Sequence, residues 1–124
     1  MSAKPVIITA AIWLLLAAAV GHGAVSQEEQ RKIEGLIRCV EGMTDAQFLR
    51  NGRAYNSKTA AWFLKKKWEA NRDKIETSKD FVARIATRSS TTGIIYTIRL
   101  KDGTTVPCGD YLNGLLEKGM VGTN

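Results

Sequence analysis

The sequence predicts a small α+β domain, with about four helices and a β-hairpin before the last helix. Three observations lead to this class. Apolar residues recur at helical spacing in four segments, two of these segments begin with a capping-box pattern, and one β-branched segment leads into a turn dipeptide. A chain of 124 residues is long enough for one such domain, so we expect a signal peptide over residues 1–25 and a single domain over residues 26–124.

The first helix is expected to begin after Ser26 and to end near Glu41. Ser26 and Glu29 have the spacing of a capping box, in which the serine oxygen accepts from a backbone N–H and the glutamate reaches back to the cap. Its apolar stripe comprises Ile33, Leu36, Ile37 and Val40. Gly42 is the expected terminator, because glycine readily adopts the left-handed conformation that ends many helices.

Residues 44–55 are expected to be mainly loop. Asn51-Gly52 is a turn signal, since both residue types tolerate a left-handed backbone. Phe48–Arg50, just before the turn, is a candidate third strand. Such a strand, or a layer of helices, is needed because a bare hairpin is only marginally stable in water.

The second helix is expected to run from a cap at Asn56 or Ser57 to about Lys74. Phe63 stands beside a core stripe at helical spacing, which comprises Ala60, Ala61, Leu64 and Trp68. The helix is strongly basic, and its cations are Lys65, Lys66, Lys67, Arg72 and Lys74. Consecutive lysines point in different directions around a helix, which favours a solvated face over a single basic patch.

The third helix is expected to begin at the capping box formed by Thr77 and Asp80. Its buried face is predicted to comprise Phe81, Val82, Ile85 and Ala86. The polar segment Arg88–Gly93 then ends it. Serine, threonine and glycine in such a loop satisfy the last helix carbonyls and permit positive φ.

The hairpin is predicted from Ile94–Leu100, which is rich in β-branched residues, and from Asp102-Gly103, a preferred two-residue turn. We expect Ile94, Tyr96, Ile98 and Leu100 to share one face and the second strand to cover residues 104–106. Pro107 ends that strand. A closing helix stopped by Gly119 follows, with the apolar residues Tyr111, Leu112, Leu115 and Leu116.

The N-terminal segment is typical of a secretory signal peptide. A cationic start precedes Val6–Val20, an uncharged apolar run of 15 residues that stops at small or polar residues. A membrane-spanning helix needs about 20 apolar residues. We therefore expect cleavage between residues 21 and 27 and export to the periplasm, with an uncleaved inner-membrane anchor as the alternative.

Cleavage would remove His22, the single histidine of the chain. Catalytic Ser-His-Asp and Cys-His systems and nearly all zinc sites require an imidazole, so we expect no such chemistry, no metal and no cofactor. Cys39 and Cys108 are too few for a thiolate metal site. In an oxidising compartment they are expected to form a disulfide, and a reactive free pair is the alternative.

A family resemblance is carried by three stretches within roughly residues 34–116. They are Phe48-x-Arg50-Asn51-Gly52, then Thr77-x-x-Asp80-Phe81-Val82-x-x-Ile85-Ala86-x-x-Ser89-Ser90-x-Thr92-Gly93-x-x-Tyr96, and Tyr111-Leu112. Together they resemble the YfeK-like family of small exported bacterial proteins with a domain of unknown function. The resemblance implies the envelope of a Gram-negative bacterium and a mainly helical domain with a small β element.

The chain departs from the family pattern at three positions. Thr59 and Phe63 stand where the pattern has Glu and His, so no role of that polar pair carries over. Cys108 stands where the family more often has a small residue without a thiol, which fits a disulfide confined to this branch.

Arg50-Asn51-Gly52 and Trp62 are candidate binding residues. The Arg50 guanidinium and the Asn51 amide suit a carboxylate or a partner chain, although the same residues also make an ordinary turn. Trp62 lies outside the core stripe, so its exposure would mark a binding surface.

Ser89, Ser90, Gly93 and Tyr96 are the second group of candidate binding residues. Their hydroxyls and flexible backbone suit a polar ligand such as a glycan or a peptide, while the simpler interpretation is a loop that satisfies a helix end.

The net charge of +6 and the basic second helix would suggest nucleic acid in the cytoplasm, and export removes that partner. We therefore expect a non-catalytic binding or interaction protein, with an immunity or inhibitor protein as a special case. Its partner would be an envelope protein or an anionic envelope component. The alternative is an envelope enzyme that acts on glycan or peptide bonds through carboxylates such as Glu69, Asp73 and Glu76, or through a serine beside a lysine.

Overall fold

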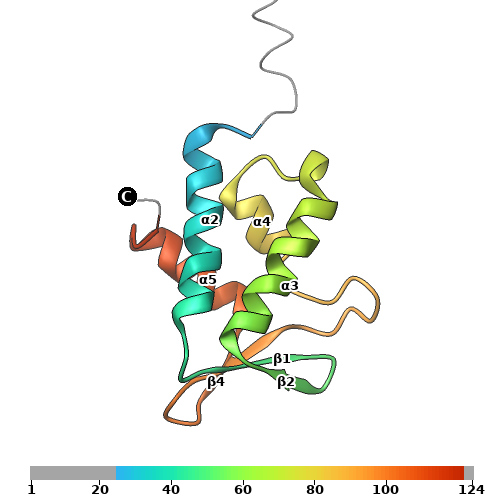
Figure 1. Ribbon diagram of the computed structural model, residues 1–124, viewed down its shortest axis with the longest axis vertical. Helices are drawn as coiled ribbons and strands as arrows, with labels where there is room; N and C mark the ends of the chain where they lie inside the picture. The colour runs from blue at the N-terminus through green and yellow to red at the C-terminus, as the bar shows by residue number, and fades with distance from the viewer. Residues whose placement is uncertain (1–24, 122–124) are drawn as a thin grey trace, which may run out of the picture.

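The computed structural model describes residues 25–121 and confirms the predicted α+β class (Figure 1). Its elements are α2 (Gln27–Gly42), β1 (Gln47–Arg50), β2 (Arg53–Tyr55), α3 (Ser57–Ala70), a 3₁₀ turn (Arg72–Lys74), α4 (Ser78–Arg84), β3 (Thr97–Arg99), β4 (Thr105–Pro107) and α5 (Cys108–Glu117). Nearly all of the predicted signal peptide lies outside the described residues. Within 25–121, no helix is both long enough and apolar enough to cross a bilayer.

The four strands form one antiparallel sheet in the order β2-β1-β3-β4 (Figure 1). Phe48 pairs with both Tyr55 and Ile98, and Ile98 pairs with Val106, so these residues share one face. Phe48 and Ile98 are buried, which identifies this face as the one turned toward the helices. The sheet thus contains the predicted hairpin and the candidate third strand. Residues 44–55, which were expected to be mainly loop, also supply β2.

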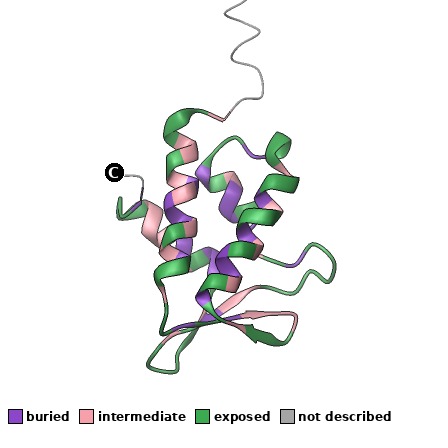
Figure 2. Ribbon diagram, viewed as in Figure 1, coloured by how far each residue is buried: buried purple, intermediate pink, exposed green. Residues whose placement is uncertain are grey.

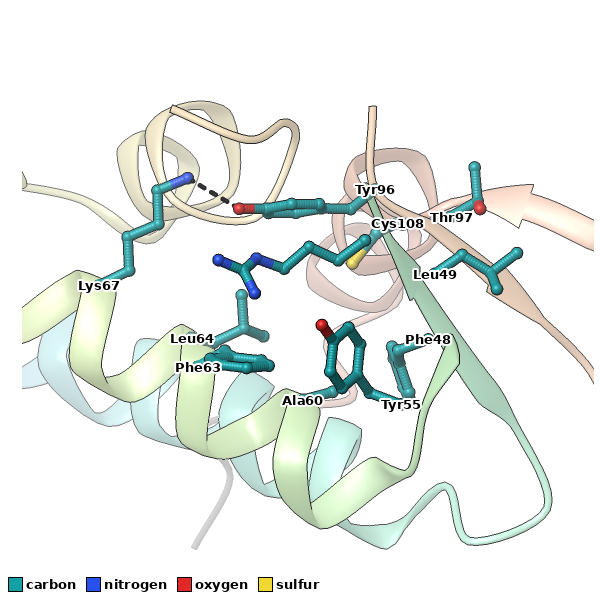
Figure 3. Close-up of a pocket in the computed structure, with 11 residues that line it drawn as sticks. Phe48, Leu49, Tyr55, Ala60, Phe63, Leu64, Lys67, Tyr96, Thr97 and Cys108 are labelled. Atoms are coloured by element: carbon teal, nitrogen blue, oxygen red, sulfur yellow. Dashed lines mark hydrogen bonds between the residues drawn. The ribbon is translucent and has the colours of Figure 1, made fainter. Parts of the chain in front are cut away.

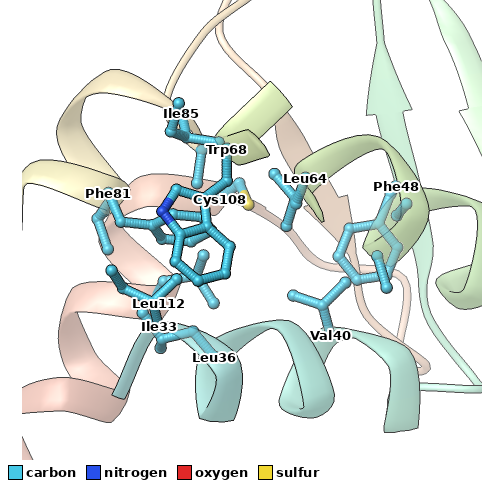
Figure 4. Close-up of a cluster of buried hydrophobic side chains, with 14 of the residues drawn as sticks. Ile33, Leu36, Val40, Phe48, Leu64, Trp68, Phe81, Ile85, Cys108 and Leu112 are labelled. Carbon is cyan, nitrogen blue, oxygen red and sulfur yellow. The ribbon is translucent and has the colours of Figure 1, made fainter. Parts of the chain in front are cut away.

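The hydrophobic core lies between the helices and continues onto the inner face of the sheet (Figures 2 and 4). The largest fully buried side chains are Phe81, Ile33, Leu36, Ile75, Ile85, Ile98, Leu112, Val40 and Val82. Burying an aliphatic side chain of this size contributes about 1.5 to 3 kcal/mol, so this cluster is the main source of stability. The predicted core stripes of the first three helices are confirmed.

The predicted capping box of the third helix is present in both halves: Thr77 accepts from the backbone of Asp80, and Asp80 accepts from the backbone of Thr77. The first helix has only one half. Ser26 accepts from the Glu29 backbone at 3.2 Å, but the Glu29 side chain is turned toward Ser78 instead of back to the cap.

Two turn predictions need correction. Gly42 does not terminate α2 in a left-handed conformation, because it is the last helical residue and Met43 follows with φ −83°. The β3–β4 turn has three residues rather than two. Leu100 pairs with Thr104, and Gly103 alone in that turn has positive φ.

The predicted disulfide is absent from the structure, in which Cys39 and Cys108 are both free cysteines. Cys108 is the first residue of α5 and is buried in the core. Cys39 is only partly buried, since it lies one residue, or about 100° of helix rotation, from the buried Val40. The two thiols therefore have different surroundings.

Candidate functional site

The β1–β2 turn and the loop before β3 are joined through the side chain of Asn51. Its Nδ2 donates to Ser89 Oγ at 3.3 Å, and its Oδ1 accepts from Thr92 Oγ1 at 2.6 Å. Asn51 and Gly52 have φ of 52° and 80°, as in the two-residue turns that suit a twisted hairpin. The tertiary structure thus brings together two of the candidate groups.

The loop at residues 88–96 is ordered largely by Ser89. Ser89 is 4% exposed, and its hydroxyl is 3.0 Å from Thr91 Oγ1 while accepting from the backbone N–H groups of Thr91 and Thr92. Its backbone N–H donates to the Ile94 carbonyl, and its carbonyl accepts from Gly93. Ser89 therefore has a clear structural role, whereas Ser90 is exposed and available to a ligand.

Helix α3 supplies an aromatic base for Arg50. The Arg50 guanidinium carbon lies 4.4 Å from the centroid of the Phe63 ring. Tyr55 meets the same ring edge-on, with centroids 5.1 Å apart. A guanidinium over an aromatic ring gains from the ring quadrupole while its N–H groups stay free for other acceptors.

The loop before β3 holds the ammonium group of Lys67 in place (Figure 3). Its Nζ donates to the Arg88 carbonyl at 2.8 Å and to the Tyr96 hydroxyl at 3.3 Å. It also lies 5.0 Å from the centroid of the Tyr96 ring. These contacts fix the ammonium group beside the tyrosine rather than leaving it free in solvent.

These residues surround two adjoining cavities, together called here the cationic hollow. The inner cavity has a volume of about 40 Å³ and is shown in Figure 3; the outer cavity has about 330 Å³. Four residues line both: Arg50, Phe63, Lys67 and Tyr96. The outer cavity is completed by Lys66, Ser89, Ser90 and Thr91.

The cationic hollow contains no acidic residue among those that line it. Lys66 pairs with Glu69 at 3.6 Å, on the exposed side of α3. Within the described part of the chain, neither Arg50 nor Lys67 forms a salt bridge. Two partly buried cations without a counterion attract an anion, because burial weakens the solvent screening of their charge.

Trp62 lies on α3 next to this site. Its side chain is 55% exposed, its ring meets Phe63 at a centroid distance of 5.5 Å, and Lys66 Nζ lies 5.9 Å from its centroid. The two candidate glycines, Gly52 and Gly93, are not part of the site. Both have positive φ and shape turns, and neither lines either cavity.

Sequence reasoning missed Tyr55, Phe63 and Lys67 as site residues. Phe63 and Lys67 are four residues apart, a spacing that places both on the same flank of a helix beside the core stripe. This spacing can be read from the sequence. Their meeting with Arg50 and Tyr96 depends on how α3 packs over the sheet, which local spacing does not reveal.

The residues expected to serve an enzyme, a serine beside a lysine or a group of carboxylates, are only partly brought together. No hydrogen bond between described residues joins Ser89 or Ser90 to a lysine, although Lys66 and Lys67 line the same cavity as both serines. Glu69, Asp73 and Glu76 do not line the hollow. Across residues 25–121, no cluster of three or more His, Cys, Asp or Glu side chains could hold a metal ion.

Comparison with known proteins confirms the family resemblance. The model of a family described as "Family of unknown function (DUF5329)" matches residues 27–119. A similar protein, "Uncharacterized protein YfeK" of Salmonella typhimurium (strain LT2), is 30% identical over 89 residues, which cover 72% of this chain and 74% of that protein. No solved structure matches the chain.

Proposed function

The chain belongs to the family of unknown function DUF5329, and on that premise we propose that it is a non-catalytic binding protein of the bacterial envelope. In this proposal the cationic hollow holds an anionic group of an envelope component. The cationic start and the apolar run Val6–Val20 support an exported protein, with the periplasm as its compartment.

The observation that carries this proposal is the placement of Arg50 and Lys67. Each is held against an aromatic ring, at 4.4 and 5.0 Å, and neither has an acidic partner within residues 25–121. Stacking leaves guanidinium N–H groups available, and a charge-assisted hydrogen bond to an anion is roughly twice as strong as a neutral one. A bound anion would supply the missing countercharge.

The rim of the hollow supports binding of a larger molecule around the anionic group. Ser90 offers an exposed hydroxyl, and Trp62 extends an aromatic surface along α3. Exposed tryptophan beside a polar cavity is typical of recognition surfaces.

The proposal is tested by following backbone amide shifts by NMR while inorganic phosphate, N-acetylalanine or phosphatidylglycerol vesicles are added to the mature protein. We expect at least one of these anions to shift signals of residues around Arg50, Phe63 and Lys67. Arg50→Gln and Lys67→Gln should each weaken that binding at least tenfold. Arg38→Gln removes an equal charge from the exposed side of α2, where the side chain lines neither cavity, and should leave it unchanged.

Two outcomes contradict the proposal. One is the absence of shifts around the hollow with all three anions at millimolar concentration. The other is an equal loss in Arg38→Gln and Arg50→Gln, since this would show that only net charge matters.

A second candidate function is an envelope enzyme acting on glycan or peptide bonds. It is favoured by the presence of Ser90 in the same cavity as Lys66 and Lys67, since a serine nucleophile can use a lysine as its base. Incubation with purified cell-wall material and detection of released fragments distinguishes the two. Release that is lost in Ser90→Ala would support the enzyme, and no release by folded protein would support the binding protein.

A further inference from the structure

The inner cavity of the cationic hollow constrains the group that enters it. Its volume of about 40 Å³ compares with about 10 to 15 Å³ needed for one water molecule, which leaves room for about three water-sized atoms. Its walls include Phe48, Ala60, Phe63, Leu64 and Cys108. This space favours a small apolar group such as methyl or isopropyl over a sugar ring or an aromatic side chain.

The cavity walls carry no negative charge that would oppose an anion at the mouth. No acid lines the cavity. Burial raises the pKa of the Cys108 thiol to about 12, so this thiol is neutral at physiological pH. Arg50 and Lys67 line both cavities, which places positive charge directly beside the small apolar space.

The occupant must therefore carry its negative charge next to a small apolar group. Resting on the proposed anion-binding function, we propose that it is the free carboxyl terminus of a peptide whose last side chain is small and apolar, such as alanine or valine. In a C-terminal residue the carboxylate and the side chain are attached to the same carbon. The carboxylate lies on Arg50 and Lys67, and the side chain enters the inner cavity.

Other envelope anions fit this arrangement less well. In a phospholipid the glycerol unit separates the phosphate from the apolar chains, and in a uronic acid the carbon next to the charged group bears oxygen and no apolar group. The planar fork of Arg50 matches a carboxylate with two parallel hydrogen bonds. Ser90 and Thr91 lie in the outer cavity, where preceding peptide groups would offer carbonyl and N–H partners.

The test measures fluorescence anisotropy of short peptides that carry an N-terminal fluorescein and differ only at the C-terminal end. The reference is Gly-Gly-Ser-Gly-Ala with a free carboxylate, and the comparisons are its C-terminal amide and the free acids ending in valine, tryptophan or lysine. We expect binding of the alanine and valine acids, with at least tenfold weaker binding of the amide and of the tryptophan and lysine peptides.

Protein variants locate the two parts of the ligand. Arg50→Gln and Lys67→Gln should weaken binding of the alanine peptide at least tenfold, while Arg38→Gln should retain it. Ala60→Val adds two methyl groups to the inner wall and should shift preference from the valine end toward the alanine end. Thermal unfolding checks that each variant is folded. If Ala60→Val does not fold, the peptide series on the unaltered protein still tests the proposal.

Each contrary outcome has a defined meaning. Equal binding of the acid and the amide, or of the alanine and tryptophan ends, overturns the proposal of a small apolar C-terminal residue. If no peptide binds but phosphate or phosphatidylglycerol vesicles bind in an Arg50-dependent way, this inference fails while the proposed anion-binding function stands. If neither the peptides nor those anions bind through Arg50, both fail.

Discussion

Glu29 accepts hydrogen bonds from both the backbone N–H and the hydroxyl of Ser78, at 2.6 and 2.9 Å. Glu29 is in the first turn of α2, and Ser78 is the first residue of α4, 49 positions later. Lys32 lies 3.2 Å from the other carboxylate oxygen. One side chain thus ties the beginnings of two helices together and satisfies a backbone N–H that the short helix α4 leaves without an intrahelical partner.

We predict that Glu29→Gln lowers the free energy of unfolding at pH 7 by about 1 to 2 kcal/mol, because hydrogen bonds to a charged group contribute more than neutral ones. The control is Glu28→Gln, which removes an exposed neighbouring carboxylate and should change stability by less than about 0.5 kcal/mol. Urea unfolding of the three proteins checks this. Equal stability of the two variants would contradict the structural role of Glu29.

The same pair predicts a pH dependence. The backbone hydrogen bond from Ser78 is the largest cause that holds the pKa of Glu29 below its ordinary value of 4.5. A depressed folded-state pKa gives stability that is present above the unfolded-state value and is lost as pH falls through the folded-state value. The difference between the unaltered protein and Glu29→Gln should therefore be full at pH 7 and shrink below about pH 4. A difference that is constant from pH 7 to pH 3 would contradict this prediction.

Gly109 allows α5 to approach the end of α4. A Cβ at this position would lie 2.8 Å from Thr87 Oγ1, which donates a hydrogen bond to the Val82 carbonyl at 2.7 Å. Gly109→Ala should therefore destabilise the protein by about 1 to 3 kcal/mol. Gly114→Ala, in the same helix with nothing within 4 Å of its added Cβ, should be neutral or stabilising by up to about 1 kcal/mol. Thermal unfolding that ranks the variants in the opposite order would contradict this account.

The two cysteines should react at different rates in the folded protein. Burial raises the pKa of Cys108 to about 12, so the thiolate that reacts with iodoacetamide is scarce at pH 8. Cys39 is partly exposed and should be alkylated first, with Cys108 modified only after unfolding. Mass spectrometry of protein purified without reductant measures this. Two cysteines that resist alkylation even after unfolding would support a disulfide.

Asn51 combines a backbone and a side-chain role, and two substitutions separate them. Asn51→Gly keeps the positive φ of 52° accessible but removes the contacts with Ser89 and Thr92. Asn51→Ala removes the contacts and also strains the backbone. We expect faster hydrogen exchange of residues 89–94 in both variants and an extra loss of about 1 kcal/mol of stability in Asn51→Ala. Unchanged exchange in both would show that the loop is ordered without Asn51.

Local pattern determined several features of this protein. Helix positions, the Ser26 and Asn56 caps and the capping box of Thr77 and Asp80 follow from interactions within four residues of each other. The core stripes follow from helical periodicity, and the turn at Asn51-Gly52 follows from the preference of these residues for positive φ. The segment Phe48–Arg50 was a candidate strand because a bare hairpin needs a further strand or a helix layer, whereas β2 was missed because three residues are too few for an alternating pattern.

Only the tertiary structure decided what the polar and charged side chains do. The sequence placed Arg50 and the loop serines among the binding candidates, but their proximity requires Asn51 to bridge 38 residues to Ser89. The same is true of Lys67 and Tyr96, 29 residues apart, and of Glu29, which has the spacing of a capping box and binds Ser78 instead. A long charged side chain can form hydrogen bonds of similar free energy with several partners. Which partner lies within reach depends on which helices and strands pack next to each other.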